Sequence, residues 1–107
     1  MKIEWTEDAL QSYEMVLGYT AQNFGIQQVH KIRSIIEAKV ASLLSFSSFG
    51  VHEYEWSEQT NADIRSIIVK HVIKIVYSVQ DDTCIILAIW DVRRNPDDLL
   101  GIINGKM

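Results

Sequence analysis

Basic side chains gather in the second half of the sequence, where they could hold phosphate groups or an acidic partner. The segment 64–80 contains three basic residues and no acidic one, and Arg65 and Lys74 are among the three. Further along, an apolar run is followed by the adjacent Arg93 and Arg94. Charged donors of this kind make strong hydrogen bonds to phosphate and carboxylate oxygens. These four residues are therefore the first candidates for a binding site.

Two more side chains in the same region could take part in proton transfer. His71 lies where two predicted strands meet in a turn, and a histidine exposed there could act as a general acid or base. Tyr77 ends the second of these strands, where we expect it to pack in the core with its hydroxyl at the rim.

Each basic residue also has a purely structural interpretation. Arg65 could pair with Asp63, and Arg94 with Asp91, at the edge of a sheet. Adjacent residues of a strand point to opposite faces, so only one of Arg93 and Arg94 is expected to face a site. Both interpretations stay open at the level of sequence.

Composition limits the classes of protein that the chain can represent. Hydrophobic residues make up 48% of the 107 residues and charged residues 22%, which is typical of a globular protein and excludes a disordered one. This length predicts a single domain over residues 1–107. The net charge of -4 argues against a protein that coats nucleic acid nonspecifically, because that binding depends on many cations.

The sequence shows no sign of export, of a membrane span or of a metal site. The residues after Met1 lack the features of a secretory signal, and no apolar run is long enough to cross a membrane, so we expect a cytoplasmic protein. The single cysteine, Cys84, lies in an apolar stretch and is expected in the core. His30, His52 and His71 are too scattered to suggest a metal site, and we predict no cofactor.

Hydrophobic periodicity predicts the elements that would position these residues. A short strand at 2–5 precedes two helices, at 6–25 and 26–43, that form an antiparallel hairpin around Gly25. Stretches rich in β-branched residues between 64 and 90 predict three antiparallel strands joined by short turns, followed by a tail from Asn95. The predicted fold class is α+β, in the order β-α-α-β-β-β.

Two regions between these elements need separate interpretation. The segment 45–63 lacks a clear pattern and predicts a long loop, with a short strand or turn at most. It could be functional, or it could be a connector held to the core by its aromatic residues. The strongly apolar stretch 84–90 would promote aggregation at a sheet edge, so we expect it inside the sheet.

The order of residues in the last third resembles the RelE/ParE toxin superfamily. The shared pattern is an arginine that opens a strand, a tyrosine that closes the next strand, an acidic turn, and an apolar strand that ends in arginines before Asn-Pro. The matching positions here are Arg65, Tyr77, Asp81-Asp82, Arg93-Arg94 and Asn95-Pro96. The resemblance implies a toxin of a type II toxin–antitoxin system, related to plasmid stabilisation proteins, that inhibits growth by acting on the ribosome with its mRNA or on DNA gyrase.

The resemblance leaves open whether the chain is an enzyme. Ribosome-dependent nucleases of the superfamily use cations with an acid and a base, and the catalytic residues in that case would be Arg65, Lys74, Arg94, His71 and Tyr77. Ile67 stands where such nucleases can have another basic residue, and Leu100 stands near their C-terminal tyrosine position.

At Ile67 and Leu100 the chain lacks the second basic residue and the C-terminal tyrosine of such nucleases. The gyrase-type mechanism, which requires only a binding surface, is therefore the preferred prediction. Arg65, Lys74, Arg93 and Arg94 would then be binding residues. A nuclease is the alternative, and a non-toxic remnant or regulatory binding module is a further one. In each case the resemblance implies a cognate antitoxin, acidic where it meets Arg65, Lys74 and Arg94.

Overall fold

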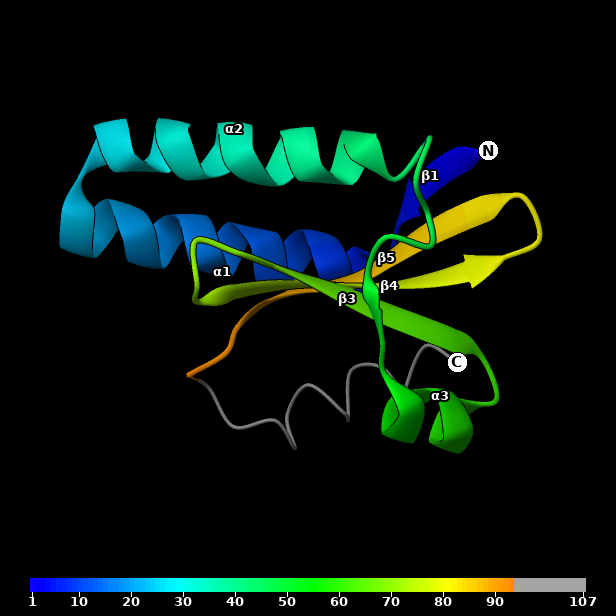
Figure 1. Cartoon of the computed structure of the whole chain (residues 1–107). Coiled ribbons are helices and arrows are strands. Elements are labelled where there is room, and N and C mark those ends of the chain that lie inside the picture. Colours follow the sequence, from blue (N-terminus) through cyan, green and yellow to red (C-terminus); the bar gives the residue numbers. More distant parts are fainter. Residues whose placement is uncertain (94–107) are drawn as a thin grey trace.

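Two long helices lie along one side of a five-stranded sheet (Figure 1). The computed structural model of the chain describes residues 1–93. In chain order the elements are β1 (Lys2–Trp5), α1 (Glu7–Phe24), α2 (Ile26–Ser42), β2 (Val51–His52), α3 (Tyr54–Thr60), β3 (Asp63–Val69), β4 (Ile73–Gln80) and β5 (Thr83–Asp91). The predicted α+β class is confirmed.

The helical hairpin begins and turns at residues whose chemistry suits those places. The Thr6 side chain accepts a hydrogen bond of 3.0 Å from the Ala9 N–H and so caps α1, whose first turn is acidic. Gly25 joins the two helices with a φ of 89°, a conformation that a residue with a Cβ rarely adopts. The predicted pair of helices around Gly25 is confirmed.

The sheet has the strand order β1-β5-β4-β3-β2. Strands β3, β4 and β5 form the predicted antiparallel meander, while β1 pairs parallel with β5, so the sheet is mixed. Because β5 lies between β1 and β4, the most apolar strand is inside the sheet, as predicted.

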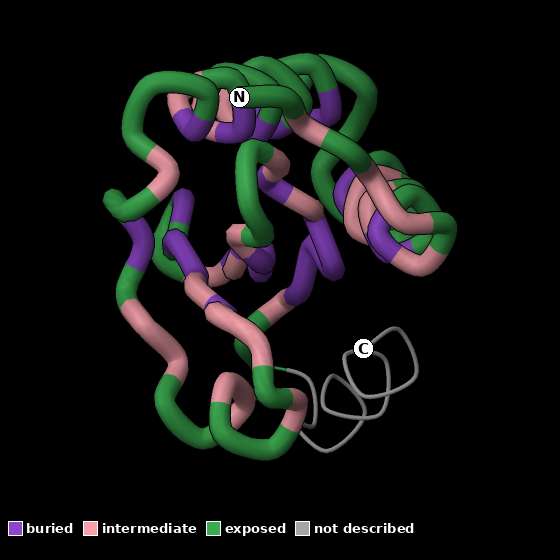
Figure 2. The backbone as a smooth tube through the Cα atoms, turned by 90° about the vertical axis from the view of Figure 1, so that its right-hand side faces the viewer, coloured by how far each residue is buried: buried purple, intermediate pink, exposed green. Residues whose placement is uncertain are grey.

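Both faces of the sheet are apolar, and each has its own cover. The buried residues of the helices face the sheet (Figure 2), and there Ile36 packs with Ile75 and Ile86. The opposite face holds a second cluster, in which Trp56 of α3 packs against buried residues of the meander. A β-bulge where β5 pairs with Val76 and Tyr77 places Leu87 and Ala88 together in this second cluster.

The segment 45–63 is more regular than the sequence predicts, because it contains β2 and α3. The helix α3 ends at Asn61, which has a φ of 56° and which tolerates this left-handed conformation better than most residues. The Ser57 hydroxyl holds α3 to β3 by accepting from the Ile64 N–H at 2.9 Å and donating to its carbonyl at 3.2 Å. The prediction of a long loop is therefore wrong for 54–60.

Two further expectations concern membrane association and Cys84. Among residues 1–93, no helix combines the length and the apolar character that a membrane span requires. Cys84 is fully buried in the cluster between the helices and the sheet, as predicted, and this burial raises the pKa of its thiol to about 11.

Candidate functional site

Arg65 lies on the side of β3 that faces the helices, since it alternates in phase with the buried Ile67 and Val69. Its guanidinium Nε lies 3.2 Å from an Asp63 carboxylate oxygen, so the ion pair considered from the sequence is present. The same side chain donates to the carbonyls of Ser48 and Gly50, at 3.2 Å each. Arg65 therefore holds the chain that follows α2, and its charge is balanced.

Tyr77 lies opposite Arg65 in the pairing of β3 with β4 and holds the same segment. It is fully buried, and its hydroxyl donates to the Ser47 carbonyl at 2.8 Å and accepts from the Gly50 N–H at 2.9 Å. Burial, above all, raises the pKa of this hydroxyl. We call Arg65 and Tyr77 the loop clamp, because together they fix residues 47–50.

Lys74 lies on the opposite face of the sheet from the loop clamp. Its Nζ is 3.2 Å from a carboxylate oxygen of Glu53, which also accepts a hydrogen bond from the Ser66 hydroxyl. The same Nζ lies 5.2 Å from the centre of the Trp56 ring. The charge of Lys74 is thus balanced by a carboxylate that the sequence analysis did not connect with it.

His71 is far from the loop clamp, at the turn between β3 and β4. Arg65 and Val69, the last residue of β3, are four steps apart, which corresponds to about 13 Å at roughly 3.3 Å per residue, and His71 follows in the turn beyond. Its side chain is exposed, and both Lys70 and His71 have left-handed φ angles, of 55° and 66°. No hydrogen bond or ion pair within residues 1–93 joins His71 to Arg65, Lys74 or Tyr77.

Arg93 lines an apolar groove and pairs with Asp91, the last residue of β5. Its Nε lies 2.9 Å from Asp91 Oδ1, and its guanidinium carbon lies 5.9 Å from the centre of the Tyr19 ring. The contact with Asp91 raises the pKa of Arg93. Arg94, which we expect to meet an acidic part of the antitoxin, lies outside the described residues, and so does Leu100.

The candidate residues are consequently distributed rather than assembled. Arg65 and Tyr77 share one place, Lys74 lies on the other face of the sheet, and His71 and Arg93 lie elsewhere. His52, Asp63 and Arg65 do lie together, with Asp63 Oδ1 3.5 Å from His52 Nε2 and 3.2 Å from Arg65 Nε, but the cation there is paired with the carboxylate. Among residues 1–93, no group of three histidine, cysteine, aspartate or glutamate residues is placed to hold a metal ion.

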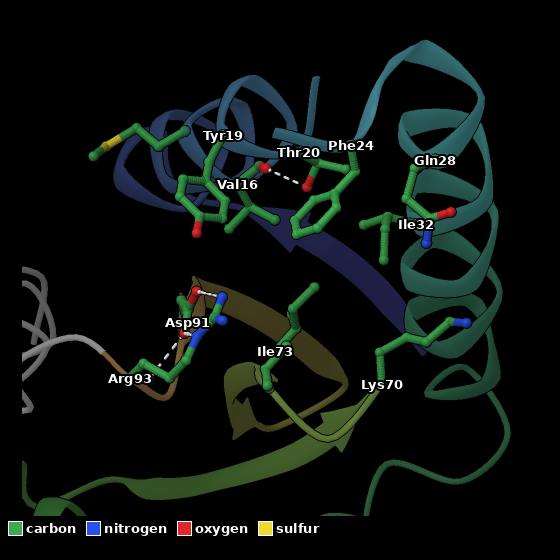
Figure 3. Close-up of a pocket in the computed structure, with 12 residues that line it drawn as sticks. Val16, Tyr19, Thr20, Phe24, Gln28, Ile32, Lys70, Ile73, Asp91 and Arg93 are labelled. Carbon is green, nitrogen blue, oxygen red and sulfur yellow. Dashed lines mark hydrogen bonds and ion pairs between the residues drawn. The ribbon is translucent and has the colours of Figure 1, made fainter. Parts of the chain in front are cut away.

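The groove itself was not predicted from the sequence. It has a volume of about 670 Å³ and opens between the two long helices, the turn after β3 and the end of β5 (Figure 3). Phe24 and Tyr19 on its wall are 65% and 48% exposed, although both are large and apolar. The indication of the groove in the sequence was that Tyr19 and Phe24, two aromatic residues of α1, lie outside the buried stripe of that helix. The residues that line the groove are Met15, Val16, Tyr19, Thr20, Phe24, Gln28, Ile32, Lys70, Val72, Ile73, Asp91 and Arg93.

One charge on the rim of the groove lacks a partner in the described part of the chain. No carboxylate of residues 1–93 forms an ion pair with Lys70, whereas Arg93 is paired with Asp91. An apolar groove with one available cation fits a protein segment that presents apolar side chains and a carboxylate.

Comparisons with known proteins agree with the fold. A family model described as "ParE toxin of type II toxin-antitoxin system, parDE" matches residues 3–96. The chain is similar in structure to the solved "Chromosomal ParDE TA system from P. aeruginosa", with a TM-score of 0.69 and 17% identity over 86% of this chain and 96% of that chain. No curated protein matches the chain in sequence.

Proposed function

Because the chain belongs to the ParE toxin family of type II toxin–antitoxin systems, we propose that it inhibits bacterial growth by binding a protein target of the DNA gyrase type. We further propose that it acts in the cytoplasm and that a cognate antitoxin neutralises it by occupying the groove between α1, α2 and the sheet.

The observation that carries this proposal is the pairing of Arg65 and Lys74, the two cations that match basic positions of the superfamily. A nuclease needs cations that are free to stabilise the charged transition state of phosphoryl transfer, close to a base and an acid. Here Asp63 pairs with Arg65, Glu53 pairs with Lys74, and the two pairs lie on opposite faces of the sheet. This arrangement supports a toxin that acts by binding rather than by cutting RNA.

The groove supports the second half of the proposal. Contiguous apolar patches exposed on a monomer mark surfaces that another molecule covers, and the exposed rings of Phe24 and Tyr19, with centres 6.5 Å apart, form such a patch. An antitoxin segment with an apolar face would cover them, and an acidic residue of that segment would pair with Lys70.

The test is induction of the protein in a bacterium, alone and together with the antitoxin encoded beside it. We expect growth to stop when the protein is made alone and to resume when the antitoxin is made as well. Phe24→Ser should stay toxic but should lose rescue by the antitoxin. Leu10→Ser is the matched control, because Leu10 is an exposed apolar residue of α1 that does not line the groove.

Two outcomes would contradict the proposal. Unchanged growth with abundant folded protein would show a remnant without a target. Rescue of Phe24→Ser by the same amount of antitoxin as for the wild-type chain would place the antitoxin elsewhere.

A further inference from the structure

A second exposed apolar surface lies at the open edge of the sheet, away from the groove. Phe49, Val51 and Ile68 are 66%, 71% and 56% exposed, and they surround a hollow of about 370 Å³. Glu53 and Lys74 also line this hollow. We call Phe49, Val51 and Ile68 the edge surface.

The edge surface offers an unpaired stretch of strand. The short strand β2 pairs only with Arg65 and Ser66 of β3, so among the described residues no strand pairs with Ile68 on that side. The Glu53 N–H donates to the Ile64 carbonyl at this same edge. Main-chain groups of a strand alternate with a period of two, and those of Ile68 therefore point to this edge as well. An extended segment of another chain could continue the sheet there.

The loop clamp gives this surface a fixed shape. Arg65 and Tyr77 bind the main chain at residues 47, 48 and 50, on both sides of Phe49. A surface that is ordered before binding loses less conformational entropy when a partner arrives. Exposed aromatic side chains on a fixed loop are thus suited to docking.

Charge indicates the chemistry of the partner. Lys74 in the hollow is already neutralised by Glu53. Lys39 lies with its Nζ 5.5 Å from the centre of the Phe49 ring, and no carboxylate of residues 1–93 forms an ion pair with it. A complementary partner would present an apolar side chain to the hollow and a carboxylate to Lys39.

We propose that the edge surface is where the toxin holds its protein target, through an extended segment of the target that carries apolar and acidic side chains. This inference rests on the proposed function. The edge surface shares no residue with the groove, and Ile68 lies on the face of the sheet opposite to the helices. Target and antitoxin would therefore bind at separate places.

The experiment compares toxicity and antitoxin binding in two variants of the edge surface, Phe49→Ser and Ile68→Lys. Both residues are exposed, so both variants should fold, which circular dichroism and thermal unfolding would verify. We expect the inducer level needed for growth arrest to rise about tenfold or more, as for the loss of an interface hot spot. The Kd for the antitoxin encoded beside the toxin should stay within about threefold of the wild-type value. Leu44→Ser is the control, because Leu44 is an exposed residue of the same loop that does not line the hollow.

Four results would overturn the inference, and each has a separate meaning. Folded variants with wild-type toxicity would show that the edge surface does not bind the target. Variants that stay toxic but no longer bind the antitoxin would show that the edge surface binds the antitoxin. A wild-type dimer that Ile68→Lys dissociates would show that the edge surface is a contact between two copies of the chain. If the wild-type chain does not arrest growth, the proposed function is wrong, and the assignment of the edge surface to target binding is wrong with it.

Discussion

The Tyr77 hydroxyl and the Gly50 main chain meet across 27 residues of sequence, with 2.9 Å between the Tyr77 oxygen and the Gly50 nitrogen. A Cβ added at Gly50 would overlap this hydroxyl, so the approach requires glycine. The contact links β4 to the loop after α2 and gives that loop its shape.

Tyr77→Phe should therefore lower stability through two lost hydrogen bonds. The Gly50 N–H and the Ser47 carbonyl would be left without their partner, and we expect a loss of about 1–3 kcal/mol in the free energy of unfolding. Urea unfolding would measure it. Tyr13→Phe is the control, because the Tyr13 hydroxyl contacts exposed side chains, such as Glu37 at 3.4 Å, rather than a buried main chain. Equal losses in the two variants would contradict the role of the clamp.

Lys74→Met should lower stability. It leaves the Glu53 carboxylate without its cation at a site where both side chains are largely buried, and we expect a loss of about 1–2 kcal/mol in the free energy of unfolding. Urea unfolding would measure it. Lys31→Met, at an exposed position of α2, should leave stability unchanged. A Lys74→Met protein as stable as the wild-type chain would contradict the importance of the pair with Glu53.

His71→Gly should keep or raise stability. A left-handed conformation costs an L-residue about 1–2 kcal/mol, which glycine avoids, although glycine loses roughly 0.5–1 kcal/mol more entropy on folding. The net gain should be as much as about 1 kcal/mol, measured by thermal unfolding, with toxicity unchanged. Val72→Gly, in the same turn but without a left-handed φ, should be destabilising. A loss of toxicity in His71→Gly would support a proton-transfer role for His71.

The burial of Cys84 predicts a pH dependence of stability. The thiol has a pKa of about 11 in the folded chain and about 9.0 when exposed, so the unfolded chain loses its proton first as the pH rises. Stability is therefore full below pH 9 and falls between pH 9 and 11, by up to about 1.4 kcal/mol per pH unit.

Cys84→Ala isolates this contribution. The variant should be less stable at neutral pH, because its side chain is smaller, but its stability should fall less between pH 9 and 11. The pKa of Tyr77 is also raised, first by its own burial, which is common to both proteins, and to a smaller extent by Cys84, so the comparison reports Cys84 together with its influence on Tyr77. Parallel curves of unfolding free energy against pH would contradict the assignment.

The parts of the fold that the sequence predicts are those with a long, regular pattern. The helices around Gly25 and the meander each repeat their apolar spacing over many residues, and both are confirmed. The helix α3 was missed because it has seven residues, none of them buried, and no side-chain cap at Glu53. Its position depends on contacts of Ser57 with the next strand, β3, and of Trp56 with buried residues of the whole meander, which local pattern does not contain.

The site was harder to predict, for a related reason. Matching Arg65 and Lys74 to family positions identified them as candidates for the site. It did not show that they lie on opposite faces of the sheet. The pairing of Lys74 with Glu53 spans 21 residues, and only the folded chain brings the two together. The groove forms between residues of α1, α2, the turn after β3 and the end of β5, so the sequence showed Tyr19 and Phe24 outside the buried stripe of α1 but not the surface that they line.

The most direct test of the account is supercoiling of DNA by purified gyrase, titrated with the folded protein. We expect supercoiling to fall as the protein is added and to recover when the antitoxin is added. The same preparation should leave mRNA on translating ribosomes intact, and Arg65→Lys should behave as the wild-type chain does if it folds. Unchanged supercoiling by a protein that arrests growth and cuts mRNA on ribosomes would contradict the account and establish a nuclease.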